Sequence, residues 1–385
     1  MKIGHYTYQP GARGGIASYV RRLGNAQADI GHDVEYLCRN GEGSDLPSVR
    51  EVNGDVDLFE TAQQRRLDVL HLHRRIRHLP EHRVPTVRTM HGNQGSCPSG
   101  SRFLKRSGRP CNRDYSVSGC LWGHLIDHCG SRRPGNVVNN FRRIETEHEL
   151  AAKIPTATVS RFVKERMIRS GCMPDHLKVI HSPAPDLNRP PAPLQHKDPP
   201  RMLFAGRIEP KKGVEWLLRS LPKTDVPVFL DVAGTGDIAY MQKVKALVED
   251  LGLTGRITFH GWVEEADVYR LIEQARAVVV PSLWHEPAGL VTLEAAAVGR
   301  PVIASQVGGI SEYARDPFAL QVSPGDVDEL AECIDRLALD PERAASMGQQ
   351  ARAIARDRFS MDDFVSNIMD LYRSTVTTAN GLMRR

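Results

Sequence analysis

The feature that most constrains the fold of this chain is a cluster of prolines near its middle. Seven prolines lie within eighteen residues, at positions 183, 185, 190, 191, 193, 199 and 200. Proline lacks a backbone N–H and clashes with a preceding helical turn, so this segment continues neither a helix nor a central strand. We therefore predict a linker at residues 184–200, which divides the 385 residues into two domains.

Short apolar segments alternate with amphipathic ones on both sides of this linker. Strand-like segments precede it at 1–8, 34–38, 67–71, 86–90 and 157–160, and follow it at 201–205, 228–233, 257–260, 277–280 and 302–305. Such alternation is typical of a parallel sheet with helices on both faces. We predict an α/β fold of two Rossmann-like, doubly wound domains, at residues 1–183 and 201–360, facing a central cleft.

The end of the chain, residues 361–385, is predicted to contain a separate helix. Its apolar residues recur at helical spacing, at Phe364, Val365, Ile368, Leu371 and Tyr372. Such a stripe requires a surface to cover, and the sequence does not indicate which domain supplies it.

The net charge of +5 is unevenly distributed. Residues 1–185 hold 28 Lys and Arg against 18 Asp and Glu, and residues 186–385 hold 23 against 28. A basic half suggests an anionic partner, such as a membrane surface, a nucleic acid or a phosphorylated substrate. The alternative is that scattered arginines only keep a surface hydrated.

The chain shows no apolar stretch of membrane-spanning length, and its first residues lack the pattern of a signal peptide. We expect a cytoplasmic protein with reduced thiols.

Residues 282–294 form the most informative window of the second domain. They follow the apolar segment 277–280 and contain Pro287-Ala288-Gly289, a sharp turn into a helix that ends near Gly299. The free N–H groups of Ala288, Gly289 and Leu290 are predicted to form an anion site at the positive end of this helix. Glu286 and Glu294 are predicted to border the same groove, although they can also be an ordinary cap acid and a solvated helix residue.

A second window, residues 206–213, follows the first strand of the second domain. Arg207 and Lys212 stand five residues apart in a loop shaped by Pro210 and Gly213. One arginine can bind two phosphate oxygens at once and lysine adds a point charge, so this loop suits a diphosphate. Alone, it could equally be a solvated charged loop.

Together these windows resemble the retaining glycosyltransferases of GT-B architecture, of the glycosyltransferase family 4-like, group 1 type. The resemblance rests on Gly206-Arg207 with Lys212-Gly213, on Glu286 and Glu294 with seven residues between them, and on 299–305 (GRPVIAS) and 308–312 (GGISE). It extends more weakly to 14–15 (GG), 70–73 (LHLH), 89–91 (TMH) and 159–160 (VS). It covers nearly the whole chain.

The resemblance implies a nucleotide-sugar donor bound mainly by the second domain. Arg207 and Lys212 would stabilise the leaving diphosphate, Glu294 would bind the ribose, and Glu286 and His91 would bind the transferred sugar. The remaining donor-binding residues would be Gly15, Gly206, Trp262, Ala288, Gly289 and Leu290, although Trp262 could equally be a packed side chain. Gly92 follows His91 where many relatives have Asp.

The resemblance also implies the reaction. A retaining glycosyltransferase would transfer a hexose-type sugar from a UDP- or GDP-sugar to a hydroxyl of a glycan or glycolipid in surface polysaccharide biosynthesis. Preorganised cations and helix N–H groups can neutralise the diphosphate without a metal, so no cofactor is expected. The alternatives are a nucleotide-sugar epimerase of the same fold and a non-catalytic nucleotide-sugar-binding scaffold.

Two acidic pairs match the D-x-D pattern of metal-binding glycosyltransferases, at Asp55/Asp57 and Asp326/Asp328. Neither follows a strand beside the predicted diphosphate loop, so we expect both to be loop or helix-start acids. Gly234 and Gly236 are expected to turn the chain near the cleft.

Four cysteines follow His91 closely, at Cys97, Cys111, Cys120 and Cys129. Thiolates in a reducing compartment can hold a structural zinc ion, but the paired C-x2–4-C spacing is absent. Structural zinc, separately packed thiols and disulfides all remain open.

The basic residues of the first half are expected near the acceptor side. This surface would suit an anionic bilayer and a lipid-linked acceptor, with peripheral attachment at the inner face of the cell membrane. Nucleic acid is not expected, because no recognised binding motif accompanies the charge. The residues concerned include Arg65, Arg66, Arg74, Arg75, Arg77, Arg83, Arg102, Lys105, Arg106 and Arg109.

Overall fold

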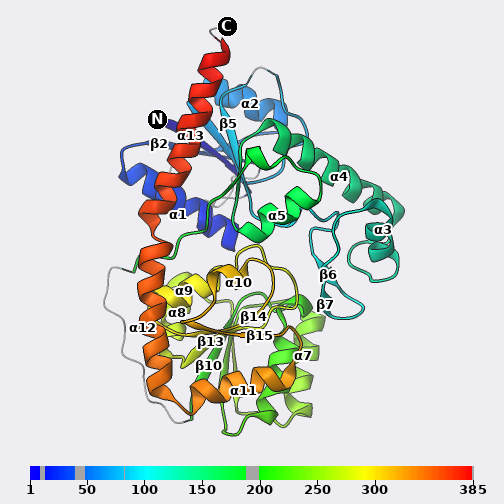
Figure 1. Ribbon diagram of the computed structural model, residues 1–385, viewed down its shortest axis with the longest axis vertical. Helices are drawn as coiled ribbons and strands as arrows, with labels where there is room; N and C mark the ends of the chain where they lie inside the picture. The colour runs from blue at the N-terminus through cyan, green and yellow to red at the C-terminus, as the bar shows by residue number, and fades with distance from the viewer. Residues whose placement is uncertain (9–13, 40–47, 82, 188–198, 384–385) are drawn as a thin grey trace.

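A computed structural model describes residues 1–8, 14–39, 48–81, 83–187 and 199–383 (Figure 1). Most of the predicted linker, at 188–198, lies outside the described residues, as do residues 9–13 of the loop before the first helix.

The first domain is built on a seven-stranded parallel sheet of order β3-β2-β1-β4-β5-β8-β9. Helices alternate with these strands along the chain, so the sheet is covered on both faces (Figure 1). The strands are β1 Lys2–Thr7, β2 Asp33–Cys38, β3 Val49–Glu51, β4 Val69–Leu72, β5 Thr86–Met90, β8 Thr156–Thr158 and β9 Leu177–Val179, and the helices are α1 Gly15–Asp29, α2 Asp55–Gln64, α4 Pro134–Lys153 and α5 Arg161–Arg169.

The second domain is built on a six-stranded parallel sheet of order β12-β11-β10-β13-β14-β15. Its strands are β10 Arg201–Ala205, β11 Phe229–Ala233, β12 Ile257–Gly261, β13 Ala277–Val280, β14 Val302–Ser305 and β15 Ala319–Val322. Its helices are α6 Val214–Ser220, α7 Ile238–Asp250, α8 Glu265–Gln274, α9 Leu290–Val298, α10 Ile310–Tyr313 and α11 Val327–Ala338.

Both sheets are doubly wound, and the predicted α/β class of two Rossmann-like, parallel-sheet domains is confirmed. The ten predicted strands are observed within two residues of their predicted ends. In each sheet the strand order reverses between two central strands, β1 and β4 in the first and β10 and β13 in the second. Ligands of such sheets bind outside the carboxyl ends of the strands at this point.

Two long helices complete the chain and run along one side of the molecule (Figure 1). Helix α12, Pro341–Arg358, packs on α9 of the second domain, whereas α13, Met361–Met383, crosses to the first domain and contacts α1. The predicted stripe on α13 is buried against Ile3, Tyr19, Val20 and Leu23. The helix therefore completes the core of the first domain, which answers the question that the sequence left open.

The connection from β5 to α4 projects from the side of the first domain (Figure 1). It contains a short hairpin, β6 Phe103–Leu104 and β7 Arg109–Pro110, and the helix α3, Val117–Leu125. Among the helices of the described chain, none has the length and apolar character required to cross a bilayer.

Candidate functional site

A cavity of about 920 Å³ lies between the two domains. Its size is within the range of ligand-binding clefts, and it is placed where the strand order reverses in both sheets. The eleven residues predicted to act in catalysis or donor binding all line it: Gly15, His91, Gly206, Arg207, Lys212, Trp262, Glu286, Ala288, Gly289, Leu290 and Glu294.

Two helix N-termini meet across this cavity. Helix α1 begins at Gly15 and helix α9 at Leu290, and a Cβ built on Gly15 would lie 3.1 Å from Leu290 Cδ1. Gly289 precedes α9 with φ of 80°, a left-handed conformation that L side chains disfavour. Each N-terminus has unpaired N–H groups and a partial positive charge, so their convergence favours an anion between the domains.

Lys212 and Glu286 form an ion pair in the wall of the cavity, in which Glu286 is buried and Lys212 is half-buried. Lys212 Nζ lies 2.6 Å from Glu286 Oε1, and the Ser282 hydroxyl donates to the same oxygen. Burial alone would raise the pKa of the Glu286 carboxyl, but the charge of Lys212 and these hydrogen bonds outweigh it and lower that pKa. Glu286 is therefore a carboxylate at neutral pH.

Gly213 explains how Lys212 reaches that position. Its φ of 74° is left-handed, and a Cβ at this residue would stand 1.7 Å from the carbonyl oxygen of Pro281. Only glycine allows the loop after β10 to press against the loop after β13. Because of this close approach, the two sequence windows form one site.

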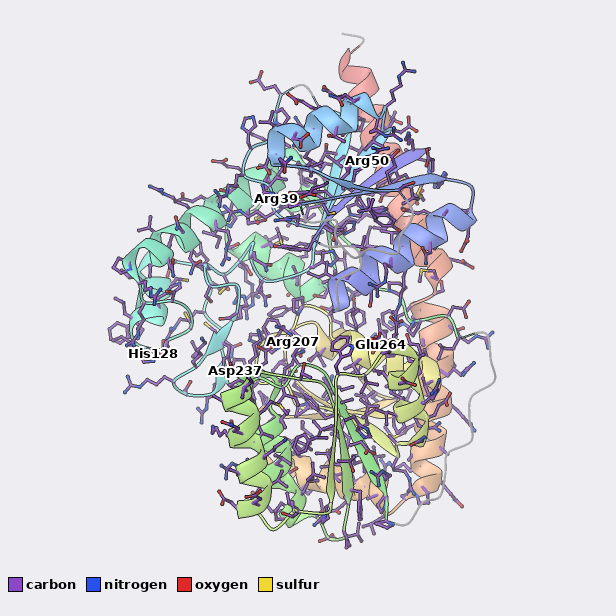
Figure 2. The ribbon with its side chains drawn as sticks, turned by 180° about the vertical axis from the view of Figure 1, so that it is seen from behind. Arg39, Arg50, His128, Arg207, Asp237 and Glu264 are labelled. Atoms are coloured by element: carbon purple, nitrogen blue, oxygen red, sulfur yellow. The ribbon has the colours of Figure 1, made fainter. Side chains whose placement is uncertain are left out.

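Arg207 is placed differently from Lys212. Its side chain is 69% exposed at the cavity edge, where Nη2 lies 3.2 Å from Glu209 Oε1. In Figure 2, Arg207 and Glu264 both lie at the level where the two domains face each other. The neighbouring Lys211, which sequence reasoning did not single out, stacks its ammonium 4.4 Å from the centre of the Trp284 ring.

Glu294 is contacted from the opposite domain by Arg22. Arg22 Nη2 lies 3.7 Å from Glu294 Oε1, 2.6 Å from Glu265 Oε1 and 2.8 Å from the Tyr269 hydroxyl. Burial raises the pKa of Glu294, although Arg22 partly opposes this effect. Sequence reasoning missed Arg22 and Glu265, because only the folded chain brings α1 beside α8 and α9.

Trp262 lines the cavity and is 42% exposed, and its Nε1–H donates to Glu264 Oε1 at 3.2 Å. A residue exposed to this extent is not fully packed. The predicted turn at Gly234 also lines the cavity.

His91 lies at the end of a chain of buried histidines. His91 Nε2 is 3.1 Å from His73 Nδ1, and His73 Nε2 is 2.9 Å from His5 Nδ1. Burial lowers the pKa of His91 to about 3 and that of His5 to about 4, and lowers that of His73 well below its ordinary value. All three rings are therefore neutral at physiological pH.

Gln27 determines which nitrogen donates in each hydrogen bond between these histidines. Its Nε2 is 3.3 Å from the Tyr372 hydroxyl and 3.8 Å from the Met369 sulfur, both acceptors, so its Oε1 accepts from His5 Nε2–H at 2.7 Å. Neutral imidazole has one donor and one acceptor nitrogen. His5 therefore accepts from His73, which accepts from His91 Nε2–H.

This order of donors leaves Nδ1 of His91 as a hydrogen-bond acceptor.

His71 belongs to the same hydrogen-bonded network. Its Nδ1 lies 2.6 Å from the Tyr372 hydroxyl and its Nε2 lies 2.8 Å from Thr89 Oγ1. His5, His71 and His73 are close enough to share a metal ion, with ligand atoms within 4.8 Å of one another. Because hydrogen bonds already engage every one of these ring nitrogens, the cluster is explained as a hydrogen-bonded network.

Gly92 is the position where many relatives of the family have Asp. A Cβ here would stand 2.1 Å from Gln94 Oε1, so the Gln94 amide fills the space beside Gly92, and both residues line the cavity. A side chain at 92 would require Gln94 to move.

The 308–312 segment joins the domains instead of reaching the cavity. Glu312 accepts hydrogen bonds from the backbone N–H groups of Arg161 and Phe162, at 2.9 and 2.7 Å, at the start of α5. Its Oε2 also lies 3.0 Å from His181 Nε2. The carboxylate thus occupies the positive end of a helix of the other domain.

The structure corrects the list of basic surface residues. Arg102 is 2% exposed and donates to the backbone carbonyls of Ser96 and Arg113, so it belongs to no docking surface. Arg65 forms a paired hydrogen bond with Glu35. Lys105, Arg106 and Arg109 are exposed on the β6–β7 hairpin.

The two D-x-D pairs lie at helix starts, as expected, and away from the residues that line the cavity.

Comparison with known proteins agrees with this geometry. Residues 188–354 match the family model described as Glycosyl transferases group 1. An uncharacterized glycosyltransferase of Methanocaldococcus jannaschii is 24% identical over 97% of this chain and 98% of its own. A D-inositol 3-phosphate glycosyltransferase of Xylanimonas cellulosilytica is 32% identical over 62% of this chain, which spans 61% of that relative.

Solved structures share the fold. A sucrose-phosphate synthase of Thermosynechococcus elongatus superposes with a TM-score of 0.75 at 20% identity, covering 98% of this chain and 99% of that one. HepE of Anabaena, solved with UDP-glucose, has a TM-score of 0.72 at 19% identity, covering 97% of this chain and all of that one.

Proposed function

We propose that this chain is a glycosyltransferase of the GT-B fold that transfers a hexose-type sugar from a UDP- or GDP-sugar to a hydroxyl of a glycan or glycolipid, with retention. One observation carries the proposal. One interdomain cavity collects the Lys212–Glu286 pair with its buried carboxylate, the half-buried carboxylate of Glu294 and two helix N-termini.

The diphosphate of the donor would lie at the start of α9. The N–H groups of Ala288, Gly289 and Leu290, together with Lys212 and Arg207, would bind its oxygens. These groups are preorganised, so they would stabilise the charge that develops as the diphosphate leaves. Gly15 would bring the second helix N-terminus to the same anion, and Gly206 would let the backbone approach it. We propose that this arrangement requires no metal ion or cofactor.

The sugar and the nucleoside would occupy opposite ends of the cavity. Glu286, kept ionised by Lys212, would accept hydrogen bonds from hydroxyls of the transferred sugar, and Nδ1 of His91 would accept another. Glu294 would bind the ribose, and Trp262 would pack against the base. HepE binds UDP-glucose, which favours a uridine nucleotide as the first donor to test.

Retention would follow from attack on the face that the diphosphate leaves. The bond from the anomeric carbon to the phosphate oxygen breaks while the bond to the acceptor oxygen forms. The acceptor proton passes to the departing diphosphate, so charge and atoms balance without a covalent enzyme intermediate.

An exposed apolar helix favours a lipid-linked acceptor. On α3 and just after it, Val117, Leu121, Trp122, Leu125 and Ile126 are exposed, and the basic hairpin residues Lys105, Arg106 and Arg109 belong to the same connection. Apolar and cationic side chains together suit an anionic bilayer. We propose that the protein works at the inner, cytoplasmic face of the cell membrane, in surface polysaccharide biosynthesis.

Flotation with liposomes tests the membrane proposal. The wild-type protein should float with vesicles containing anionic lipid and remain in solution with neutral vesicles, and Trp122→Ser with Leu125→Ser should abolish flotation. Equal flotation with both vesicle types, or none, would contradict it.

Donor binding and turnover test the activity. A thermal-shift screen should show a higher melting temperature with one nucleoside diphosphate or its sugar derivative than with the others. Lys212→Ala and Glu286→Gln should each lower hydrolysis or transfer of that donor at least 100-fold, consistent with loss of a charge that stabilises the transition state. Lys243→Ala, at an exposed pair with Glu215, is the matched control. Unchanged turnover in both site variants would refute the assignment.

A further inference from the structure

The segment between β5 and α4, residues 91–133, has almost no hydrophobic core. It contributes no residue to any of the four hydrophobic clusters found in the described chain. Phe103 is its one large apolar side chain that is buried. Segments that bury so little apolar surface generally need disulfides or a metal ion to hold one conformation.

The four cysteines of this segment converge on one small cavity. Cys97 comes from the loop after β5, Cys111 directly follows β7, Cys120 is on α3, and Cys129 is in the loop before α4. The cavity that they line measures about 20 Å³. That volume holds about one water-sized sphere, which is the scale of a single ion.

His124 lines the same cavity with an unpaired nitrogen. Its side chain is 1% exposed, and its Nδ1 lies 3.0 Å from the Ser131 carbonyl oxygen, to which it donates. Nε2 is buried and has no hydrogen-bond partner in the described chain. A histidine held in this way by a backbone carbonyl presents its other nitrogen as a metal ligand.

The charged surroundings of the cavity also suit a cation with thiolate ligands. A zinc ion binds cysteines as thiolates and displaces their protons. The buried Arg102 guanidinium, which donates to the Cys111 carbonyl, would offset the surplus negative charge of the thiolates.

We propose that this cavity is a structural zinc site, with a tetrahedral ion held by four ligands drawn from Cys97, Cys111, Cys120, Cys129 and His124. Sulfurs around a bound zinc ion lie about 3.8 Å apart. In the described chain, His5, His71 and His73 are the only three such residues whose ligand atoms all lie within 4.8 Å of one another, so no three of the proposed ligand atoms are yet as close as in a zinc complex. Zinc binding therefore draws the four loop segments together.

Disulfides are the competing explanation, and the structure argues against them. All four cysteines are free thiols. Two disulfides would crosslink the loops but would leave the buried Nε2 of His124 unpaired, which is unfavourable for a buried polar atom. Zinc accounts for the thiols, the nitrogen and the ion-sized cavity together.

Metal analysis of the full-length protein tests the proposal directly. The protein, purified without added metal or chelator, should contain about one zinc per chain by mass spectrometry. Cobalt exchanged into the site should give the visible absorption of a tetrahedral thiolate complex. The double variant Cys111→Ser with Cys129→Ser should lose the metal, whereas Cys333→Ala, a buried cysteine of the second domain, should retain it.

The wild-type measurement decides the outcome even if the double variant fails to fold. A zinc content below about one tenth per chain, with no uptake of added zinc, would overturn the proposal. Thiol labelling that finds two disulfides in metal-free protein would overturn it equally. Because metal content is measured independently of sugar transfer, failure here leaves the proposed activity untouched.

Discussion

At the scale of single residues, the Lys212–Glu286 pair should have a measurable and pH-dependent effect on the free energy of unfolding. Lys212→Ala should lower the free energy of unfolding by about 3 kcal/mol at pH 7.5, because it leaves a buried carboxylate without its cation. In the wild type the folded pKa of Glu286 is lowered, so its stabilisation is present above the unfolded pKa and is lost as pH falls through the folded pKa. In the variant, burial dominates and raises the folded pKa of Glu286 above its unfolded value. The ionised carboxylate then destabilises the folded state at pH 7.5, and this destabilisation is lost as pH falls through the folded pKa.

The difference in unfolding free energy between wild type and Lys212→Ala should therefore shrink as pH falls from 7.5 to 5. Urea denaturation across that range measures it, and the double variant with Glu286→Gln should recover part of the loss. A difference independent of pH would contradict a buried ion pair.

A second residue-scale prediction concerns His91. Because its pKa is lowered to about 3 and the Gln27 amide sets the donor order, Nδ1 should be unprotonated and Nε2 protonated from pH 5 to 8. Nitrogen chemical shifts of labelled histidine report both states. In Gln27→Leu the fixed order is lost, so a mixture of tautomers is expected. A charged His91 at pH 6 would refute the deduction.

At the scale of elements, helix α13 is joined to the first domain by its apolar stripe and also by the Tyr372 hydroxyl. Tyr372→Phe leaves His71 Nδ1 without its buried partner and leaves Gln27 Nε2 with only the Met369 sulfur, which should cost about 1–3 kcal/mol of stability. Tyr36→Phe is the matched control, since Tyr36 is a buried tyrosine of the same hydrophobic cluster. Chemical denaturation of the two variants compares them, and equal losses would argue against the network.

Arg22 links α1 to α8 and α9, and its loss should alter donor binding. Arg22→Ala removes the cation that partly offsets the raised pKa of Glu294, so that pKa should rise further. A protonated Glu294 accepts fewer hydrogen bonds from ribose hydroxyls. The donor KM should therefore increase, roughly tenfold near pH 6 and less at pH 8.

Arg270→Ala, an exposed residue on α8 paired with Asp267, is the control for that measurement. An increase in KM that does not depend on pH would show that Arg22 acts by another route.

At the scale of the whole molecule, the order of strands and the cavity follow from features visible in the sequence. Alternating apolar segments predicted both sheets, and the rule for doubly wound sheets placed the Arg207–Lys212 and Glu286–Glu294 windows on one cleft. The edge strands β3, β9 and β15 escaped prediction. Unlike the equally short but fully buried β8, β13 and β14, they are partly exposed. They also mix apolar with polar residues, so they carry too little pattern.

Contacts between distant segments were not predictable from the chain alone. Arg22 with Glu265, and Glu312 with the start of α5, join residues more than a hundred positions apart. The partners of a charged side chain depend on the relative placement of the two domains, which local sequence does not encode. The burial of Arg102 was missed for another reason: its partners are backbone carbonyls of its own segment, and the sequence does not show how that segment folds back on itself.

Removal of α13 should unfold the first domain. Phe364, Val365, Ile368 and Leu371 are buried in its core, and each contributes about 1.5–3 kcal/mol, so together they rival the whole stability of a domain. A chain ending at residue 360 should lose cooperative unfolding of the first domain and bind a hydrophobic dye. The milder Ile368→Val should cost about 1 kcal/mol and keep the fold. A truncated chain with native-like denaturation would contradict this role.

Because α13 returns to the first domain, the two domains should not complete their folding in the order in which they are synthesised. Domains usually fold in the order in which the ribosome makes them. Here the second sheet and α12 are complete by residue 358, whereas the core of the first domain lacks part of its apolar surface until Tyr372 has left the ribosome. The half that is made first should therefore be the last to become protease-resistant, and it would depend on chaperones for most of its synthesis.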